Sequence, residues 1–423
     1  MRYFSFFLTA LIIYLYLPGI ALAGNTLWQF QSIDTMKYSR DIAKEMLNND
    51  SFNETIDRQV QIISSLGATH VAIATPYDAE FLPFLAKWVQ AARKYNLNIW
   101  LKGNFSGWEG WFGYPAIDRS THILKTKEFI INNSDLFKNG DIFSSCPECE
   151  NGGPGDPRFT KDVIGYRNFL INEYETTKKI FAQIGKEVRT NVFPMNGDVA
   201  KLIMDKNTTQ ALDDLVCIDH YTASPDQFAE DIEILAKQSG GKIVLGEFGA
   251  PIPDINGKMN DSQQAEFVQK LLLALYKNKN LVAGVNYWTL TGGSTKLVNT
   301  DLTPRPAAGV IKNFFQPTIV SGTVTDPVGR PIGRALITTT DGINEQSNAE
   351  GKFSFPVPFG QTITIKAKAE NYQTFAQKIT TGEARELSLA VRLNPQTNNL
   401  LQTLMTFLKK LEAIFDRWGP TKV

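Results

Sequence analysis

The sequence predicts an α/β fold: a (β/α)8 barrel followed by a small all-β sandwich and a C-terminal amphipathic helix. Three observations support this prediction. Between residues 25 and 295, β-like segments alternate with helical patterns, which is typical of a parallel barrel. From residue 317, short strands joined by Gly, Pro and Asn turns replace that alternation. After residue 399, apolar residues recur along one helical face.

Residues 1–23 have the pattern of a signal peptide. A basic Arg2 precedes the apolar run Phe4–Leu17, and Ala21–Ala23 supplies a small-x-small cleavage pattern. An uncleaved membrane anchor is the alternative, because Tyr3–Leu22 carries no charge and is just long enough to span a bilayer. Cleavage predicts a secreted or extracytoplasmic protein.

The acidic and basic residues of the chain are balanced in number. Its 423 residues include 43 basic and 43 acidic side chains, so the formal net charge is zero. This balance gives no reason to expect nucleic acid or an anionic membrane as a partner. The length exceeds that of one ordinary domain, and roughly 250 residues are typical of a barrel.

The barrel is expected over residues 24–316, with eight strands separated by amphipathic helices. The expected strands are Leu27–Ser32, His70–Thr75, Asn98–Gly103, Asp141–Cys146, Val188–Phe193, Leu215–Tyr221, Ile243–Gly246 and Ala283–Trp288. Helical spacing of apolar residues is clearest over 81–89, 164–181 and 267–275, and a helix at 307–314 is expected to close the barrel. A doubly wound open sheet is the alternative, but no glycine-rich phosphate loop follows the first strand.

Carboxylates follow two of these strands. Glu247 lies between two glycines after the apolar strand Ile243–Gly246, and Glu148 and Glu150 follow Asp141–Cys146. The carboxyl ends of barrel strands meet at the mouth, where the active sites of such barrels lie. Two carboxylates across one mouth suit cleavage of a glycosidic bond, whereas a surface or helix-capping role is the alternative for each.

These residues resemble those of the clan of retaining β-glycoside hydrolases, TIM barrels that include cellulases and β-mannanases. The resemblance covers roughly 25–315 and is clearest in Leu245-Gly246-Glu247-Phe248-Gly249. It implies that Glu247 is the nucleophile and Glu148 the acid/base, with Glu150 as the alternative acid/base. No metal and no organic cofactor are implied.

The same resemblance assigns two aromatic residues to the site. Tyr221, at the end of its strand, matches the tyrosine that hydrogen-bonds the nucleophile, and Trp288 matches the tryptophan that floors the central sugar site. Strand alternation places Tyr221 on the opposite face from His220, so we expect His220 to be structural.

The chain departs from the clan pattern in two places. Pro147 stands where an asparagine commonly precedes the acid/base, and His70–Thr75 offers no counterpart to an arginine commonly found near the nucleophile. A barrel that binds sugar without cutting it therefore stays an alternative.

A glycine-spaced aromatic loop follows the third strand. Lys102, Asn104, Trp108 and Trp111 are expected to contact a carbohydrate, because sugar faces pack on aromatic rings while hydroxyl groups need polar partners. Aromatic packing within a long loop is the alternative.

Two of the three cysteines bracket Glu148. Cys146 and Cys149 either close a small disulfide loop or are small buried thiols, and the third is Cys217. This pair of cysteines, in a chain with only three histidines, does not suggest a metal site.

Residues 317–394 resemble the carboxypeptidase regulatory-like domain, a transthyretin-like sandwich. The matching stretches are 322–326 with 329–332, Glu350–Phe355 and Ala369–Tyr372. The expected strands are Ile319–Asp326, Ala335–Thr340, Gly351–Val357, Thr362–Ala367, Phe375–Thr380 and Leu387–Leu393. The resemblance implies an accessory or spacer module.

Residues 395–423 are a polar linker and an amphipathic helix. Charged residues such as Lys409, Lys410 and Glu412 exclude a transmembrane segment. The apolar face is expected to dock on the protein itself or to mediate self-association, with a membrane surface as a further alternative.

The sequence as a whole predicts a secreted retaining β-glycoside hydrolase that acts on a poly- or oligosaccharide. The alternatives are a non-catalytic carbohydrate-binding protein on a silent barrel and a surface-assembly protein.

Overall fold

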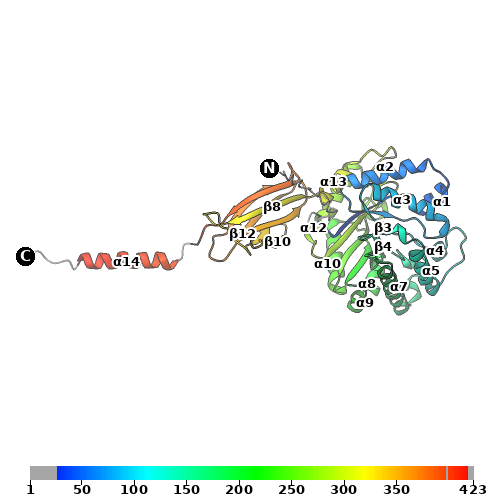
Figure 1. The fold of residues 1–423 in the computed structure, drawn as a ribbon, viewed down its shortest axis with the longest axis horizontal. Coiled ribbons are helices and arrows are strands. Elements are labelled where there is room, and N and C mark those ends of the chain that lie inside the picture. The colour runs from blue at the N-terminus through cyan, green and yellow to red at the C-terminus, as the bar shows by residue number, and fades with distance from the viewer. Residues whose placement is uncertain (1–25, 397–398, 418–423) are drawn as a thin grey trace, which may run out of the picture.

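The computed structural model describes residues 26–396 and 399–417. The expected signal peptide, 1–23, lies outside the described residues. Figure 1 shows a barrel, a smaller β-sandwich beside it and the helix α14 (Asn399–Arg417) beyond the sandwich.

Seven parallel strands curl into the barrel in the order β4-β3-β2-β1-β7-β6-β5. They are β1 (Phe30–Asp34), β2 (His70–Ile73), β3 (Asn98–Leu101), β4 (Ile142–Phe143), β5 (Leu215–Asp219), β6 (Lys242–Phe248) and β7 (Val282–Tyr287). Most of their residues are buried, because helices cover the outside and side chains fill the inside.

The expected strand at Val188–Phe193 is wrong as a regular strand. Arg189 forms a single parallel bridge with Ile142, and a second isolated bridge further along reaches β5. The Ser144 hydroxyl donates a hydrogen bond of 2.6 Å to the Val192 carbonyl, which in a regular ladder would accept from a backbone N–H. The segment therefore closes the barrel between β4 and β5 with few backbone ladder bonds.

The helical predictions are confirmed. The long helices are α1 (Ser39–Met46), α2 (Phe52–Ser65), α3 (Leu82–Lys94), α5 (Arg119–Asn132), α7 (Val163–Gln183), α10 (Pro225–Ser239), α12 (Asp261–Lys277) and α13 (Pro306–Phe315). Short helical turns lie in the connections: η1 (Ala79–Phe81), α4 (Ser106–Glu109), η2 (Ser134–Leu136), η3 (Cys149–Asn151), α6 (Pro157–Thr160), α8 (Gly197–Ile203), α9 (Lys206–Ala211) and α11 (Pro253–Asn256).

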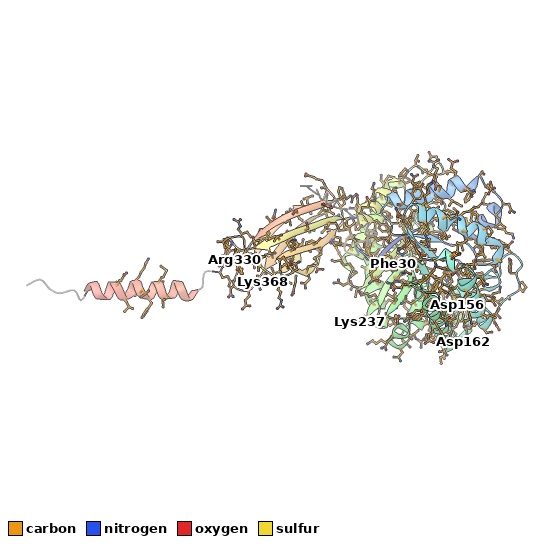
Figure 2. The ribbon with its side chains drawn as sticks, in the orientation of Figure 1. Phe30, Asp156, Asp162, Lys237, Arg330 and Lys368 are labelled. Atoms are coloured by element: carbon orange, nitrogen blue, oxygen red, sulfur yellow. A yellow bond between two sulfur atoms is a disulfide. The ribbon has the colours of Figure 1, made fainter. Side chains whose placement is uncertain are left out.

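Aromatic rings fill the interior of the barrel. The Phe30 ring meets those of Trp100 and His70 edge to face, with centroids 5.7 and 5.8 Å apart, and Figure 2 labels Phe30 in the barrel. A Cβ on Gly284 would lie 2.2 Å from the Phe30 ring, so only glycine fits there. The ammonium of Lys102, which follows β3, lies 5.6 Å from the centre of the Trp100 ring. This packed layer of rings therefore lies next to the carboxyl end of β3.

The second unit has two sheets, in the orders β10-β9-β12-β13 and β11-β8-β14. Their strands are β8 (Thr318–Thr325), β9 (Leu336–Thr339), β10 (Asn344–Gln346), β11 (Lys352–Val357), β12 (Thr362–Lys368), β13 (Phe375–Thr380) and β14 (Glu386–Arg392). The expected strands are confirmed, and the short, exposed β10 is an addition. A separate apolar core lies between the two sheets.

Polar contacts join the barrel to the sandwich, and the two units lie side by side in Figure 1. The Tyr276 hydroxyl donates to Asp341 at 2.5 Å, and the Phe359 amide donates to the Asn313 carbonyl at 2.9 Å. These contacts link two cores without merging them.

The helix α14 carries exposed apolar side chains, among them Leu404 and Phe407, each 57% exposed. No helix within the described residues is long and apolar enough to cross a membrane.

We predict that a chain ending at residue 316 folds into a stable barrel, because the barrel core excludes the sandwich. Circular dichroism and thermal unfolding of the fragment test this. As a control, Tyr276→Phe in the full chain removes one contact between the units and should cost about 1 kcal/mol. An insoluble fragment beside a soluble full chain would show that the units need each other to fold.

Candidate active site

A cleft of about 490 Å³ opens at the carboxyl ends of the barrel strands. Acidic, basic and aromatic side chains share its wall. The residues that line it are Asp34, Met36, Lys37, Tyr38, Ser39, Arg40, Ala74, Lys102, Asn104, Glu109, Trp111, Pro147, Glu148, Asn151, Pro194, Asp219, Glu247 and Trp288.

A buried cation holds Glu247. The ammonium of Lys102, directly after β3, lies 3.1 Å from Glu247 Oε1 and 2.9 Å from Asp34 Oδ2. The side chains of Lys102 and Asp34 are only 4% and 5% exposed. Lys102 was expected to contact sugar. Lys102 lines the cleft and is also the ion-pair partner of Glu247, so it supplies a cation beside Glu247 where His70–Thr75 offers none.

Backbone and amide groups fix this ion pair in place. Asn286 Nδ2 donates to Asp34 Oδ2 at 2.7 Å and to the Gly246 carbonyl at 2.8 Å. Lys102 donates to the same carbonyl at 3.1 Å. A Cβ on Gly246 would lie 2.5 Å from Asp219 Oδ1, so the glycine before Glu247 is required by the close packing of the site.

Tyr221 binds the other oxygen of Glu247. Its hydroxyl donates to Oε2 at 2.9 Å, so both carboxylate oxygens are engaged. Burial, with Glu148 and Asp34 nearby, raises the pKa of Glu247 to about 7, while Lys102 acts to lower it. The side chain is 20% exposed, and its carboxylate therefore reaches the cleft.

Glu148 faces the same cleft from the loop after β4. Its backbone is left-handed, with φ 45° and ψ 45°, a region that side chains other than Gly, Asn and Asp seldom adopt. Burial and the neighbouring Glu150 raise the pKa of Glu148. A carboxyl in this environment holds its proton at a higher pH than an exposed one.

Glu150 lies in the wall of the barrel. Its Oε1 accepts from the Asn196 amide at 2.7 Å and its Oε2 accepts from the Tyr166 hydroxyl at 3.2 Å. The residue is 3% exposed and does not line the cleft. This geometry favours Glu148 over Glu150 as the second working carboxyl group.

The prediction that Trp108 contacts a carbohydrate in the cleft is wrong. Trp108 is 3% exposed, stacks on Phe169 with ring centroids 5.1 Å apart, and does not line the cleft. Its indole N–H donates to the Cys149 carbonyl at 3.2 Å, and its own carbonyl accepts from Gly153. The ring is therefore a buried support for the loop that carries Glu148, since its edge anchors the loop backbone.

The rest of the aromatic loop contains a carboxyl group that sequence reasoning missed. Glu109 lies between the two tryptophans and accepts from Asn104 Nδ2 at 2.8 Å. Burial raises its pKa to about 8. Trp111 lines the cleft with the Arg40 guanidinium 4.6 Å from its ring centre. Both Asn104 and Trp111 thus lie where they were expected.

Asp219 was also missed as a site residue. It is 7% exposed, lines the cleft, and within the described part of the chain neither of its side-chain oxygens has a hydrogen-bond partner. Burial, and then the neighbouring Glu247, raise the pKa of Asp219 well above the usual range of an aspartate. The sequence signal that could have identified Asp219 is its position two residues before Tyr221, on the same face of the strand.

Trp288 is half-buried at the cleft. Its ring meets Tyr221 edge to face at 6.3 Å, and Lys37 Nζ lies 5.7 Å from its centre. One side of the indole is thus fixed by the protein while the residue still borders the cleft.

The histidine and cysteine residues named in the sequence analysis have structural partners or are buried. His220 pairs with Asp231 at 3.1 Å and stacks on Phe228, as a structural histidine does. Cys146 and Cys149 form a disulfide, and Cys217 is a buried free thiol. Among the described residues, no group of three or more His, Cys, Asp or Glu side chains is arranged to hold a metal ion.

Comparison with known proteins separates the two units. Residues 319–394 match the carboxypeptidase regulatory-like domain family. No curated protein matches the chain. The sandwich is thus assigned by sequence, whereas the barrel is compared through its structure.

Solved structures similar to this chain include glycoside hydrolases. GH5_18 from Streptomyces cattleya, in complex with GlcNAc, is 13% identical over 72% of this chain and 85% of its own, with a TM-score of 0.51. XacCel5A, in complex with cellopentaose, is 11% identical over 68% of this chain and 99% of its own, with a TM-score of 0.48.

An FMN-binding β-glucuronidase from Facaelibacterium prausnitzii L2-6 is 12% identical over 84% of this chain, with a TM-score of 0.48. The match spans only 56% of that enzyme. At 13% identity, the likeness to GH5_18 shows the fold alone.

We predict that Lys102→Met destabilises the protein by about 3–5 kcal/mol, because it leaves two buried carboxylates without their cation. Loss of the cation also raises the pKa of Glu247, so any activity that needs ionised Glu247 should begin at a higher pH than in the wild type. Urea unfolding and a pH–rate profile measure the two effects. An unchanged unfolding midpoint would contradict the burial of this ion pair.

Trp288→Ala should lower turnover strongly while reducing stability by less than about 3 kcal/mol, the lower end for truncating a buried aromatic. Its half-buried place at the cleft is the reason. Trp100→Ala, in the packed layer beneath, is the matched control and should cost about 3–5 kcal/mol. Equal destabilisation by both would move Trp288 to the core.

Proposed function

We propose that this protein is a retaining β-glycoside hydrolase that acts on a poly- or oligosaccharide outside the cytoplasm. The observation that carries the proposal is the placement of Glu247 and Glu148 in one cleft, with Lys102 and Tyr221 holding the first of them. The fold shared with GH5_18 agrees with this proposal.

Glu247 would act as the nucleophile. Lys102 and Tyr221 orient its carboxylate, and the positive charge of Lys102 favours the ionised form against the effect of burial. Attack on the anomeric carbon forms a glycosyl ester and breaks the bond to the leaving oxygen. Both oxygens of Glu247 have a donor, so the geometry of attack is fixed before the sugar arrives.

Glu148 would act first as the acid and then as the base. Its raised pKa keeps it protonated to a higher pH, which allows it to protonate the departing oxygen. Glu148 raises the pKa of Glu247, and the interaction between the two charges is mutual. Esterification of Glu247 removes its negative charge, so the pKa of Glu148 falls and the group can then accept a proton from water.

The wall of the cleft suits a sugar. Trp288 and Trp111 offer apolar faces for sugar C–H groups, while Asp219, Asn104 and Glu109 offer polar partners for hydroxyl groups. The sandwich would serve as an accessory module beside the barrel.

A non-catalytic carbohydrate-binding barrel is the second candidate. Pro147 favours it, because the cleft residue before Glu148 has no side-chain amide to bind a sugar hydroxyl. A mechanism-based 2-deoxy-2-fluoro glycoside separates the two candidates, since only a working nucleophile forms a stable ester. Peptide mapping should find the label on Glu247.

The carboxyl roles have a kinetic test. With an activated aryl glycoside, Glu148→Ala should slow hydrolysis of the enzyme-bound sugar, and azide should restore turnover to give a product of retained configuration. Glu247→Ala should lose activity on the order of 10²-fold or more, because the nucleophile is gone. Glu150→Ala is the matched control, expected to show no azide effect.

Three results would contradict these roles. Azide rescue of Glu150→Ala alone would reverse the two roles. Full activity in Glu247→Ala would exclude the mechanism. A separation between the working carboxyl groups of roughly 6.5–9.5 Å in a crystal structure, instead of about 5–5.5 Å, would favour inversion.

A further inference from the structure

A disulfide encloses the proposed acid/base. Cys146 and Cys149 are three residues apart, with Cα atoms separated by 5.2 Å, and only Pro147 and Glu148 lie between them. Both cysteines are buried, at 0% and 2% exposure. The bridge is therefore buried, while the two residues that it encloses line the cleft.

Glu148, one of the two residues between the cysteines, has an unfavourable backbone conformation. Glu148 is left-handed, and its amide donates to the Pro194 carbonyl at 2.6 Å while its carbonyl accepts from Asn151 at 2.8 Å. A residue with a Cβ leaves this region unless its surroundings hold it there. The Cys146–Cys149 disulfide closes a short covalent ring that contains Glu148, and this ring supplies such a constraint.

The same loop separates two glutamates. Glu148 lines the cleft, whereas Glu150 turns into the wall and is bound by Asn196 and Tyr166. In a regular strand, residues two apart point to the same face. The left-handed turn at Glu148 and the helical turn η3 that follows break this alternation and send the two side chains in different directions.

The loop is also anchored on its far side. Trp108 binds the Cys149 carbonyl, and a Cβ on Gly153 would lie 2.4 Å from the Trp108 ring. Asn104 Nδ2 lies 3.7 Å from Cys146 Sγ. These contacts hold the cysteines at the two ends of the loop, but none of them acts on the backbone torsions of Glu148.

We propose that the Cys146–Cys149 disulfide is a positioning element that holds Glu148 in its left-handed conformation and so presents its carboxyl group to the leaving oxygen. This inference rests on the proposed role of Glu148 as acid/base. Without the bridge, only the hydrogen bonds of Glu148 with Pro194 and Asn151 oppose its return to an ordinary backbone conformation, which would move its carboxyl group away from the cleft. The nucleophile Glu247 is held by Lys102 and Tyr221 and is unaffected.

The test uses the full chain with Cys146→Ser/Cys149→Ser and two substrates that differ only in the leaving group. They are the phenyl and 2,4-dinitrophenyl β-glycosides of whichever sugar, among glucose, mannose, galactose and xylose, the wild type hydrolyses best. Departure of phenolate needs an acid, whereas departure of dinitrophenolate does not. We expect kcat/KM to fall by about 10–10²-fold for the phenyl glycoside, within the contribution of general acid catalysis. For the dinitrophenyl glycoside it should fall by less than about 3-fold, because the acid makes no contribution to that step.

Cys217→Ser is the matched control, because it removes a buried thiol and leaves the bridge intact. It should keep the wild-type ratio between the two substrates. If the double variant does not fold, reduction of the wild type replaces it. A trialkylphosphine and water convert the bridge to two thiols and the phosphine oxide, and alkylation followed by mass spectrometry counts the thiols.

A readout independent of activity accompanies the kinetics. In protein with ¹³C-labelled glutamate carboxyl groups, the signal lost in Glu148→Gln identifies Glu148, and its pKa should fall toward the ordinary value when the bridge is removed. An equal loss for both substrates, or an unchanged ratio together with an unchanged pKa, overturns the inference. Absence of activity in the wild type contradicts the proposed function instead, and the pKa measurement then still decides whether the bridge positions Glu148.

Discussion

The buried Lys102 ammonium organises the mouth of the barrel. It lies between Asp34 and Glu247 and so joins side chains that follow or end strands β1, β3 and β6. A single buried ammonium is costly to desolvate, and it is stable here because two carboxylates and the Gly246 carbonyl surround it. The cleft is built outward from this point. Tyr221 donates a further hydrogen bond to Glu247, and Asn286 donates one to Asp34.

The sequence revealed the general location of the site better than the role of each residue in it. Glu247 and Glu148 could be found because each follows an apolar segment beside turn residues. Lys102 was predicted as a mouth residue, but its ion pairs with Asp34 and Glu247 were not, since a sequence does not show which strand end faces which across a barrel. Asp34 was missed because the first strand was predicted to end at Ser32, two residues too early. Every residue of β1 is buried, so its sequence lacks the alternation of polar and apolar residues that would mark the end of the strand.

Loops were the least predictable part of the fold. Trp108 and Trp111 have similar spacing and neighbours, yet one is buried under the acid/base loop and the other borders the cleft. The difference arises from the glycines 152 and 153, which leave space for the Trp108 ring from a segment far along the chain. The sandwich was easier, because exposed antiparallel strands alternate in polarity and their turns carry Gly, Pro and Asn.

The closure between β4 and β5 has a consequence for the dynamics of the barrel. Regular parallel ladders join most of the other strands. Here two isolated bridges, a few separate backbone hydrogen bonds such as that from Phe143 to Arg189, and the Ser144 hydroxyl connect β4 to β5. Local opening of a protein starts where the fewest interactions must be broken together. Amide exchange should therefore be fastest along this seam. Because the loop of Glu148 leaves the barrel at the same seam, a brief opening would part the two carboxyl groups while the rest of the barrel stays folded.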